Sequence, residues 1–328
     1  MSPKLKENVW HIDPQQDTAL LITSRNRFQV PTFAALQFLR MRSYCTGWHS
    51  VEDVACKSGL PLEDVNALLG SLAPAGIVYS GTDEGGRKLS TEHVRDVLLR
   101  ACGIWSDELR ISYIGNEFAQ GALPKSVLIG WLLEMYHYIR DFPDAIEHGA
   151  AHANGKLRDV LRRYADEERG HEGFVLQTLV NLGMSKVEVT TSIPLLSTRL
   201  VGFLMRELFE LEPASALMVA AVIEAQEFDE QQIAGFKARL HEHYDVDVRA
   251  FDPYFRHQEI DVSLGHAALL ASNIDLVEIN DAHVLDQIVN KIHDLKHAFD
   301  LQGIEIKAYF TTLNGKYLPR QPVTFAGI

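Results

Sequence analysis

Apolar and polar residues alternate in short segments at the start of this chain. Residues 9 to 30 contain VWHID, TALLIT and RFQV, with the turn-forming stretches PQQD and SRN between them. An alternation of period two, interrupted by turn residues, is typical of short β-strands. We therefore predict that the protein begins with a small sheet.

Signals for short helices follow, up to about residue 81. Apolar residues recur at helical spacing in Ala34–Leu39, and Ser50–Asp53 and Pro61–Asp64 each resemble a helix start with acidic residues in the first turn. The run AGIVYSG at 75–81 has the composition of a strand. The predicted order is a strand meander, three helices and a final strand.

The pattern changes to long amphipathic helices after a polar, Gly-rich linker, TDEGGRKLS, at residues 82–90. We predict two domains, 1–82 and 91–328, and a mainly α fold. The last segment departs from the helical pattern, and its Asn314-Gly315 pair is a turn signal for a short hairpin or tail. The predicted helices are 91–102, 105–119, 125–141, 154–182, 195–210, 213–242, 253–272 and 280–302.

Composition restricts the partners and the compartment. The net charge of −13 and the absence of a basic run argue against nucleic acid, and the third short helix, PLEDVNALLGSLA, has no Lys or Arg to meet phosphates. Three cysteines without CxxC spacing indicate a reducing cytoplasm. There is neither a signal peptide nor an 18-residue apolar run, so we expect a cytoplasmic protein without a membrane span. A homodimer is compatible with this sequence.

Candidate metal ligands occur in three of the predicted helices. Glu168 and His171 are three residues apart, and His257 and Asp261 are one turn apart, so each pair shares a helix face. Glu224 lies within the apolar run ALMVAAVIEAQEF, where an ionised carboxylate is costly unless it binds a cation. Imidazole and carboxylate donors without a thiolate favour iron or manganese over zinc.

Each of these features also has a simpler explanation. The ExxH pair is compatible with a solvated ion pair, the HxxxD pair with an ordinary i,i+4 contact, and Glu224 with pairing to an Arg such as Arg206. Their combination on helices able to face one another favours a metal site. Glu227, one turn after Glu224, is a further candidate.

A second ExxH, at Glu134 and His137, raises the alternative of a ferritin-like dimetal protein. In that class the motif order along four helices is Glu, ExxH, Glu, ExxH. Here the order is ExxH, ExxH, Glu, HxxxD, which does not match. We therefore interpret Glu134 and His137 as pocket or packing residues, with metal binding as the lesser alternative.

The run LRDVLRRYADEERGHEGFVLQTLVNLGMS, followed by Glu224 and then YFRHQEIDVSLGH, resembles the haem-oxygenase-like diiron oxidase family, relatives of TenA and PqqC. The resemblance covers about residues 105 to 300 and implies a haem-oxygenase-like helical bundle, Fe(II) and O2 as co-substrate. Glu168 is the best match to the first-helix carboxylate, with Glu167 as its rival. The remaining ligands that the resemblance implies are His171, Glu224, His257 and Asp261.

One position departs from the family pattern H-x-x-x-D-x-x-H, because Leu264 replaces its last histidine. His266 is the substitute by composition. On a continuous helix His266 would lie about 180° from His257, whereas Leu264 would lie about 20° from it. His266 would therefore reach the site only if Gly265 ends or distorts the helix. Otherwise we expect two Fe(II) ions with one weakly held, or a single ion.

The segment HSVEDVACKSGLPLEDVNALLGSLAPAGIV, with the strands before it, resembles a winged-helix-type domain and more closely the PqqD-like peptide-recognition fold. This resemblance implies that a leader peptide adds as a strand to the sheet and packs against the third helix. The alternative is a winged-helix module used for dimerisation or packing.

Together these features predict a non-haem iron-dependent oxidase or oxygenase, with two iron ions. It would activate O2 to oxidise an amino acid, an amine or a peptide side chain, in ribosomal-peptide biosynthesis if the first domain binds a leader. One alternative is a cofactor-free, PqqC-like oxidase of a quinone-type precursor. Another is a non-enzymatic peptide-binding scaffold, with Leu264 as a trace of lost metal binding.

Overall fold

The computed structural model describes residues 2–5, 9–11, 17–22, 27–75, 77–80, 88–224, 230–311 and 320–321. The chain divides into two compact units, residues 1–104 with 280–283 and residues 105–279 with 284–328. No helix in the described ranges is both long and apolar enough to cross a membrane. The turn expected at Asn314-Gly315 lies outside the described residues.

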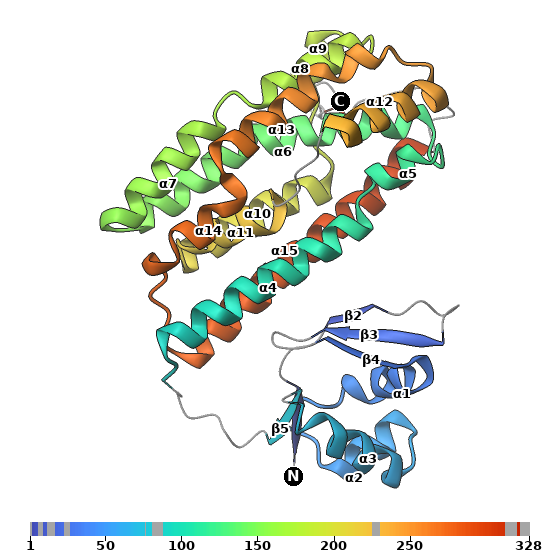
Figure 1. Ribbon diagram of the computed structural model, residues 1–328, viewed down its shortest axis with the longest axis vertical. Coiled ribbons are helices and arrows are strands. Elements are labelled where there is room, and N and C mark those ends of the chain that lie inside the picture. The colour runs from blue at the N-terminus through green and yellow to red at the C-terminus, as the bar shows by residue number, and fades with distance from the viewer. Residues whose placement is uncertain are drawn as a thin grey trace, which may run out of the picture. The chain divides into compact units, whose positions relative to one another are not determined.

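The first unit has the element order expected from its sequence, with one additional strand. Strands β2, β3 and β4 form an antiparallel sheet in that order, with Leu20 opposite Gln29, and the additional strand β1 pairs with β5. Figure 1 labels strands β2, β3, β4 and β5. Their bounds are β1 Pro3–Leu5, β2 Val9–His11, β3 Thr18–Ile22, β4 Arg27–Pro31, α1 Thr32–Arg42, α2 Val51–Ser58, α3 Leu62–Leu72 and β5 Val78–Ser80.

Local sequence explains the helix ends in this unit. The Ser50 side chain accepts from the Asp53 backbone N–H and Asp53 accepts from the Ser50 N–H, so α2 begins with a capping box. The same helix ends at Gly59, whose φ of 67° suits glycine. Apolar side chains from the strands and the three helices, including Leu21, Val54 and Val65, form the core of this unit.

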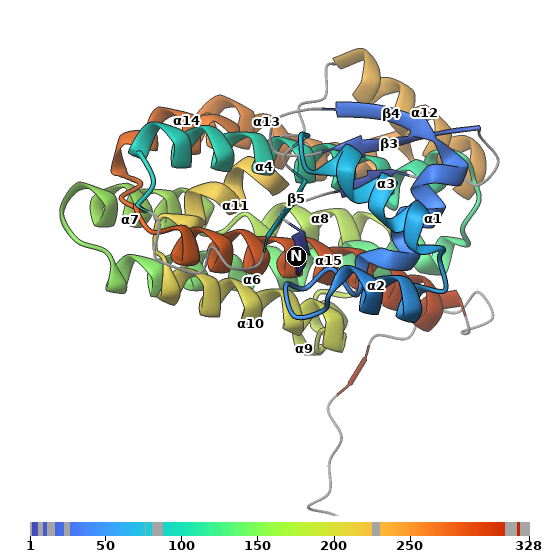
Figure 2. The ribbon, with the colours of Figure 1, turned by 90° about the horizontal axis from the view of Figure 1, so that it is seen from below.

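The second unit consists of helices, and helix α4 leads into it from the first unit, which confirms the mainly α prediction. Figures 1 and 2 show the long helices α6, α10 and α15 running side by side. The bounds are α4 Thr91–Ser112, α5 Gly115–Ala119, α6 Lys125–His152, α7 Gly155–Glu168, α8 Glu172–Asn181, α9 Lys186–Thr191, α10 Leu196–Leu211, α11 Ser215–Ile223, α12 Glu230–Tyr244, α13 Asp252–Leu264, α14 Leu269–Ser272 and α15 Ala282–Thr311, with short 3-10 turns at Val248–Phe251, His266–Ala268 and Ile274–Leu276.

Helix α6 has apolar residues on nearly all sides and lies in the core of this unit. Its Gly130 packs so closely on Phe310 of α15 that an added Cβ would overlap the aromatic ring. Ser126 donates a hydrogen bond to the Phe310 carbonyl at 2.9 Å, which holds the same two helices together. The close approach of α6 and α15 therefore requires a residue without a side chain at position 130.

Several helix boundaries differ from the prediction. Helix α4 is continuous across the break predicted between 91–102 and 105–119. The predicted helix 154–182 is instead divided into α7 and α8. The predicted helix 213–242 ends its first part at Ile223, and 253–272 is interrupted after Leu264. Apolar periodicity continues through these points, so it did not reveal the breaks. Each of the last three breaks lies beside a candidate ligand.

Candidate metal centre

Glu168 and His171 lie on either side of a helix break. Glu168 is the last residue of α7, Arg169 is extended, and Gly170 has a φ of 90° that favours glycine. The chain resumes as α8 at Glu172, and His171 Nδ1 lies 3.4 Å from Glu168 Oε2. The prediction of an i,i+3 pair on one continuous helix is therefore wrong, although the structure brings the same two side chains together.

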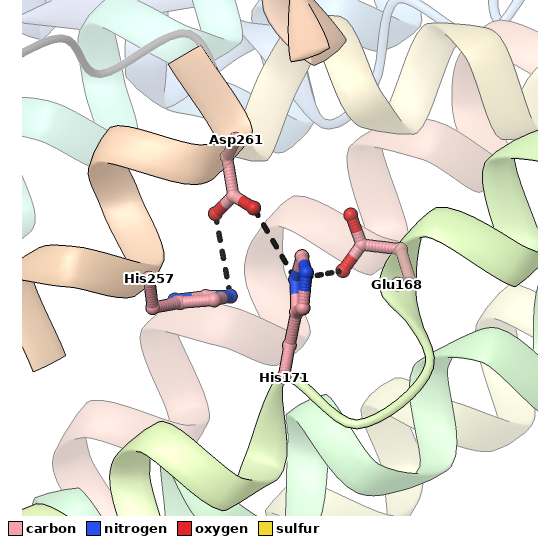
Figure 3. Close-up of side chains that lie close together, drawn as sticks. All are labelled: Glu168, His171, His257 and Asp261. Carbon is pink, nitrogen blue, oxygen red and sulfur yellow. Dashed lines mark ion pairs between the residues drawn. The ribbon is translucent and has the colours of Figure 1, made fainter. Parts of the chain in front are cut away.

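Helix α13 supplies His257 and Asp261 one turn apart. His257 Nε2 lies 3.3 Å from Asp261 Oδ2, and His171 Nδ1 lies 3.3 Å from Asp261 Oδ1. The two imidazole rings are 4.8 Å apart between centroids. Figure 3 shows these two histidines, Asp261 and Glu168 converging from different helices.

A second group of side chains meets the other oxygen of Glu168. His266 Nδ1 lies 2.8 Å from Glu168 Oε1 and 2.9 Å from Glu224 Oε2. Glu224 follows the last residue of α11, so it caps a helix end and does not lie in mid-helix as predicted. The Tyr164 hydroxyl donates a hydrogen bond to Glu224 Oε1.

His266 reaches the centre because α13 ends before it. The helix stops at Leu264, and Gly265 takes a left-handed conformation with a φ of 74°. Leu264 is 41% exposed, whereas His266 is completely buried. The expectation that His266 faces away from the candidate ligands is therefore wrong. The condition under which His266 could reach them, a helix ended by Gly265, is the one observed.

The ligand atoms form two groups that share one carboxylate. Within each group the atoms all lie within 4.8 Å of one another, which is the separation expected around a single ion. Glu168 belongs to both groups and offers one oxygen to each side. The first group is Glu168, His171, His257 and Asp261, and the second is Glu168, Glu224 and His266.

Buried polar atoms that lack a hydrogen bond indicate whether these residues could bind a metal ion. Each of the six residues has one buried nitrogen or oxygen atom that makes no well-aligned hydrogen bond among the described residues, although an oppositely charged side chain lies within 4.0 Å of it. Such atoms are costly in a protein interior unless a ligand or an ion satisfies them. Divalent cations would also offset the charge of the three carboxylates that converge here. The residues therefore fit bound metal, and their oxygen and imidazole donors suit iron or manganese.

Ionisation in this centre follows from burial and from the close charges. Burial alone lowers the pKa of His171, but hydrogen bonds to Asp261 and Glu168 outweigh it and raise the pKa to about 9. The same balance, with Glu168 and Glu224 as partners, raises the pKa of His266 to about 10. In the metal-free protein, two imidazolium ions therefore provide the positive charge that metal ions would otherwise provide.

The carboxylates respond in opposite directions. Burial opposes ionisation of Glu168, but hydrogen bonds with His171 and His266 outweigh burial and lower its pKa to about 2. For Glu224 burial dominates and raises the pKa to about 7. Burial also lowers the pKa of His257, which keeps that imidazole neutral and able to bind a metal.

The remaining sequence candidates lie elsewhere. Glu134 accepts hydrogen bonds from the Leu195 backbone N–H at 3.0 Å and from Thr198 Oγ1 at 2.6 Å. His137 Nε2 lies 2.9 Å from Ser192 Oγ. The structure thus places this second ExxH against the start of α10 and outside both ligand groups.

Glu167 and Glu227 complete the set of sequence candidates. Glu167 lies 3.3 Å from His266 Nε2, on the side of the ring away from the ligand groups, and is partly exposed. Glu227 falls outside the described residues. Of the two carboxylates proposed for the end of the first ligand helix, Glu168 is the one that the structure brings into the centre.

Sequence reasoning missed two tyrosines beside the ligands. Tyr164 lies four residues before Glu168, so helical spacing placed it on the same face of α7 and could have revealed it. Tyr138 lies on α6, which contributes no ligand, and no sequence signal connects it to the centre.

Comparison with known proteins identifies the fold of the helical bundle. No protein-family model and no curated protein matches this chain. A solved domain of unknown function with a heme oxygenase-like fold, from Shewanella denitrificans, is 17% identical with a TM-score of 0.55, over 67% of this chain and 95% of that domain. The bundle has a haem-oxygenase-like fold. A TenA homolog from Pseudomonas syringae pv. tomato is 12% identical with a TM-score of 0.47, over 68% of this chain and all of that one.

The similarity to the Shewanella domain confirms the predicted haem-oxygenase-like bundle. At these identities the similarity extends to the fold alone. The Shewanella domain has no described function. Any activity must therefore be argued from the side chains of this chain.

Proposed function

We propose that this protein is a non-haem diiron oxidase or oxygenase that uses dioxygen to oxidise an amine, an amino acid or a peptide side chain. The observation that carries the proposal is Glu168, whose two oxygens face two separate groups of buried donors. A carboxylate in this position is suited to bridge two cations. Fe(II) is the ion that the donor set and the buried surroundings favour.

The ligands divide into a set of four and a set of three around the shared carboxylate. His171, His257 and Asp261 would hold the first ion together with Glu168, and Glu224 and His266 would hold the second. The second position would therefore have fewer protein ligands. An iron pair in such a centre would supply electrons for the reduction of dioxygen.

Neighbouring side chains orient these ligands. Tyr164 donates to one oxygen of Glu224, which directs the other oxygen toward His266. The ring of Tyr164 also contacts the His266 ring, with centroids 5.0 Å apart. Glu167 is placed to accept a hydrogen bond from His266 Nε2, which leaves Nδ1 free for the metal.

The charge of the centre favours this proposal over a cofactor-free oxidase. Among the described residues, the ion pairs of Glu168, Glu224 and Asp261 are all with histidines. Three buried carboxylates repel one another, and a pair of cations would remove this repulsion and satisfy the six buried atoms that make no well-aligned hydrogen bond.

For the substrate we propose a leader-bearing peptide that binds to the first unit. The strand meander β2–β3–β4 followed by three helices is compatible with a PqqD-like domain. In the described sheet β2 and β4 each pair with one strand only, so the sheet has an edge to which a peptide strand can add. With the leader bound to the first unit, the side chain that the second unit oxidises would belong to the same peptide.

The ligand assignment can be tested by anaerobic Fe(II) titration of the full chain. We expect saturation at two ions per chain, less than one in Glu168→Gln, and two in the control Asp166→Asn, whose carboxylate is exposed on the same helix. The loaded wild-type protein should then consume dioxygen, measured with an oxygen electrode. Two ions bound to Glu168→Gln would refute the bridging role, and a wild-type chain that binds no iron would refute the proposed function.

A further inference from the structure

The hydroxyl of Tyr138 is buried and has no hydrogen-bond partner among the described residues. Its ring packs in parallel on Phe142 and edge-on against Phe299, with centroids 5.6 Å apart in both cases. A phenylalanine would provide the same ring contacts. A tyrosine at this position therefore buries a polar atom at a cost that packing does not explain.

The surroundings of this hydroxyl point to the metal centre. Phe142 packs on Tyr138 on one side and on Tyr164 on the other, and Tyr164 contacts His266. Burial raises the pKa of Tyr138 well above its usual value, and the negative charges of Glu224, Glu168 and Asp261 raise it further. The Tyr138 hydroxyl thus lies in the field of carboxylates from both ligand groups.

Tyr164 is a buried tyrosine whose hydroxyl does have a partner. That hydroxyl donates a hydrogen bond to Glu224, so the protein itself supplies its acceptor. Tyr138 has the same donor group and is linked to Tyr164 through the ring of Phe142, but the described protein offers its hydroxyl no acceptor. An acceptor supplied from outside would satisfy it.

We propose that Tyr138 is the hydrogen-bond donor to a small oxygen-containing molecule, of the size of dioxygen, that binds at the metal centre. The inference rests on the proposed function, because it needs the metal-loaded centre to hold that molecule. The phenol contributes binding and orientation, and the rings of Phe142 and Phe299 keep its environment apolar.

Azide binding to the Co(II)-loaded full-length protein tests this role without catalysis. Azide is a small anion with hydrogen-bond acceptor atoms, and its binding can be followed by visible absorption of the cobalt. For Tyr138→Phe we expect the azide dissociation constant to rise about five- to tenfold, the value of one hydrogen bond. The cobalt content should equal that of the wild type, and the melting temperature of the metal-free protein should be unchanged or higher.

Tyr244→Phe is the matched control. The Tyr244 hydroxyl is also buried, and its ring packs on Phe118, with centroids 6.3 Å apart. This control should leave the azide dissociation constant unchanged. The inference is overturned if Tyr138→Phe binds azide like the wild type, or if its metal-free form melts at a lower temperature, since the hydroxyl would then have a structural partner. A wild-type chain that binds no cobalt would instead refute the proposed function, and the inference with it.

Discussion

Protons and metal ions compete for the same nitrogen atoms in this centre. His171 lies within 3.4 Å of two carboxylates and His266 within 3.4 Å of three, and the close carboxylates hold the imidazole pKa values at about 9 and about 10 in the metal-free protein. A metal needs the neutral imidazole. Metal binding must therefore release protons, and the residues that make the site also make it sensitive to pH.

Thermal stability should consequently depend on pH in opposite ways with and without metal. The raised histidine pKa values contribute stability that is fully present below the unfolded value of about 6.5 and is lost as the pH rises through about 9 to 10. Between pH 6.5 and 8.5 we expect this contribution to the stability of the metal-free protein to decline. The increase in melting temperature caused by Fe(II) should grow over the same range.

Differential scanning calorimetry under anaerobic conditions measures both effects. His266→Gln provides the comparison, because it removes one of the two imidazolium ions and should flatten the pH dependence of the metal-free protein. A metal-induced shift in melting temperature that stays constant from pH 6.5 to 8.5 would show that neither imidazole is protonated in the metal-free centre.

Helix ends, more than helix faces, bring the ligands together. Glu168 ends α7, His171 precedes α8, Glu224 follows α11 and His266 follows the Gly265 cap of α13. Only His257 and Asp261 come from a helix interior. Short turns at these ends direct the side chains inward, at angles that a continuous helix does not provide.

Gly265→Ala tests the importance of one such turn. An added Cβ would meet no neighbouring atom, so the cost comes from the positive φ alone. We expect the free energy of unfolding to fall by about 1 kcal/mol. The Fe(II) content should also fall from two ions toward one, because His266 depends on the conformation of this residue.

The control for this prediction is Gly202→Ala in helix α10. An added Cβ is equally uncrowded there, and no positive φ is involved. Alanine in a helix interior should raise the free energy of unfolding by up to about 1 kcal/mol. Chemical denaturation and iron analysis of the two variants separate backbone strain from the loss of a side-chain ligand. Full iron content in Gly265→Ala would show that His266 finds the centre without the turn.

At the scale of the whole molecule, the metal centre belongs to one unit. All six candidate ligands lie between residues 168 and 266, within the unit that contains residues 105–279. The proposed peptide-binding sheet belongs to the other unit. Metal binding and peptide recognition should therefore be separable.

Removal of residues 1–82 should leave iron binding at two ions per chain and abolish binding of a leader-bearing peptide. Iron analysis and fluorescence anisotropy with a labelled peptide measure the two properties, and circular dichroism checks that the bundle is helical. Peptide binding of unchanged affinity would contradict the role of the first unit. Loss of iron, with the helical content retained, would contradict the separation of the two functions.

Much of the fold follows from local sequence. Alternating residues predict β3 and β4, the acidic first turns mark the starts of α2 and α3, and apolar periodicity predicts a helical second part. The interruption at Gly170 was not predicted and the one at Gly265 was only an alternative, because apolar residues continue on both sides of them and glycine is tolerated within helices.

The sequence by itself determined which chemical groups are available, namely imidazoles and carboxylates without a nearby cysteine. It also indicated His257 and Asp261, because one turn of helix places them together whatever the tertiary structure. Only the tertiary structure decided that Glu168 serves both groups and that His266 takes part. These facts depend on how separate helix ends meet, and a single left-handed glycine moves His266 from the opposite side of a helix into the centre.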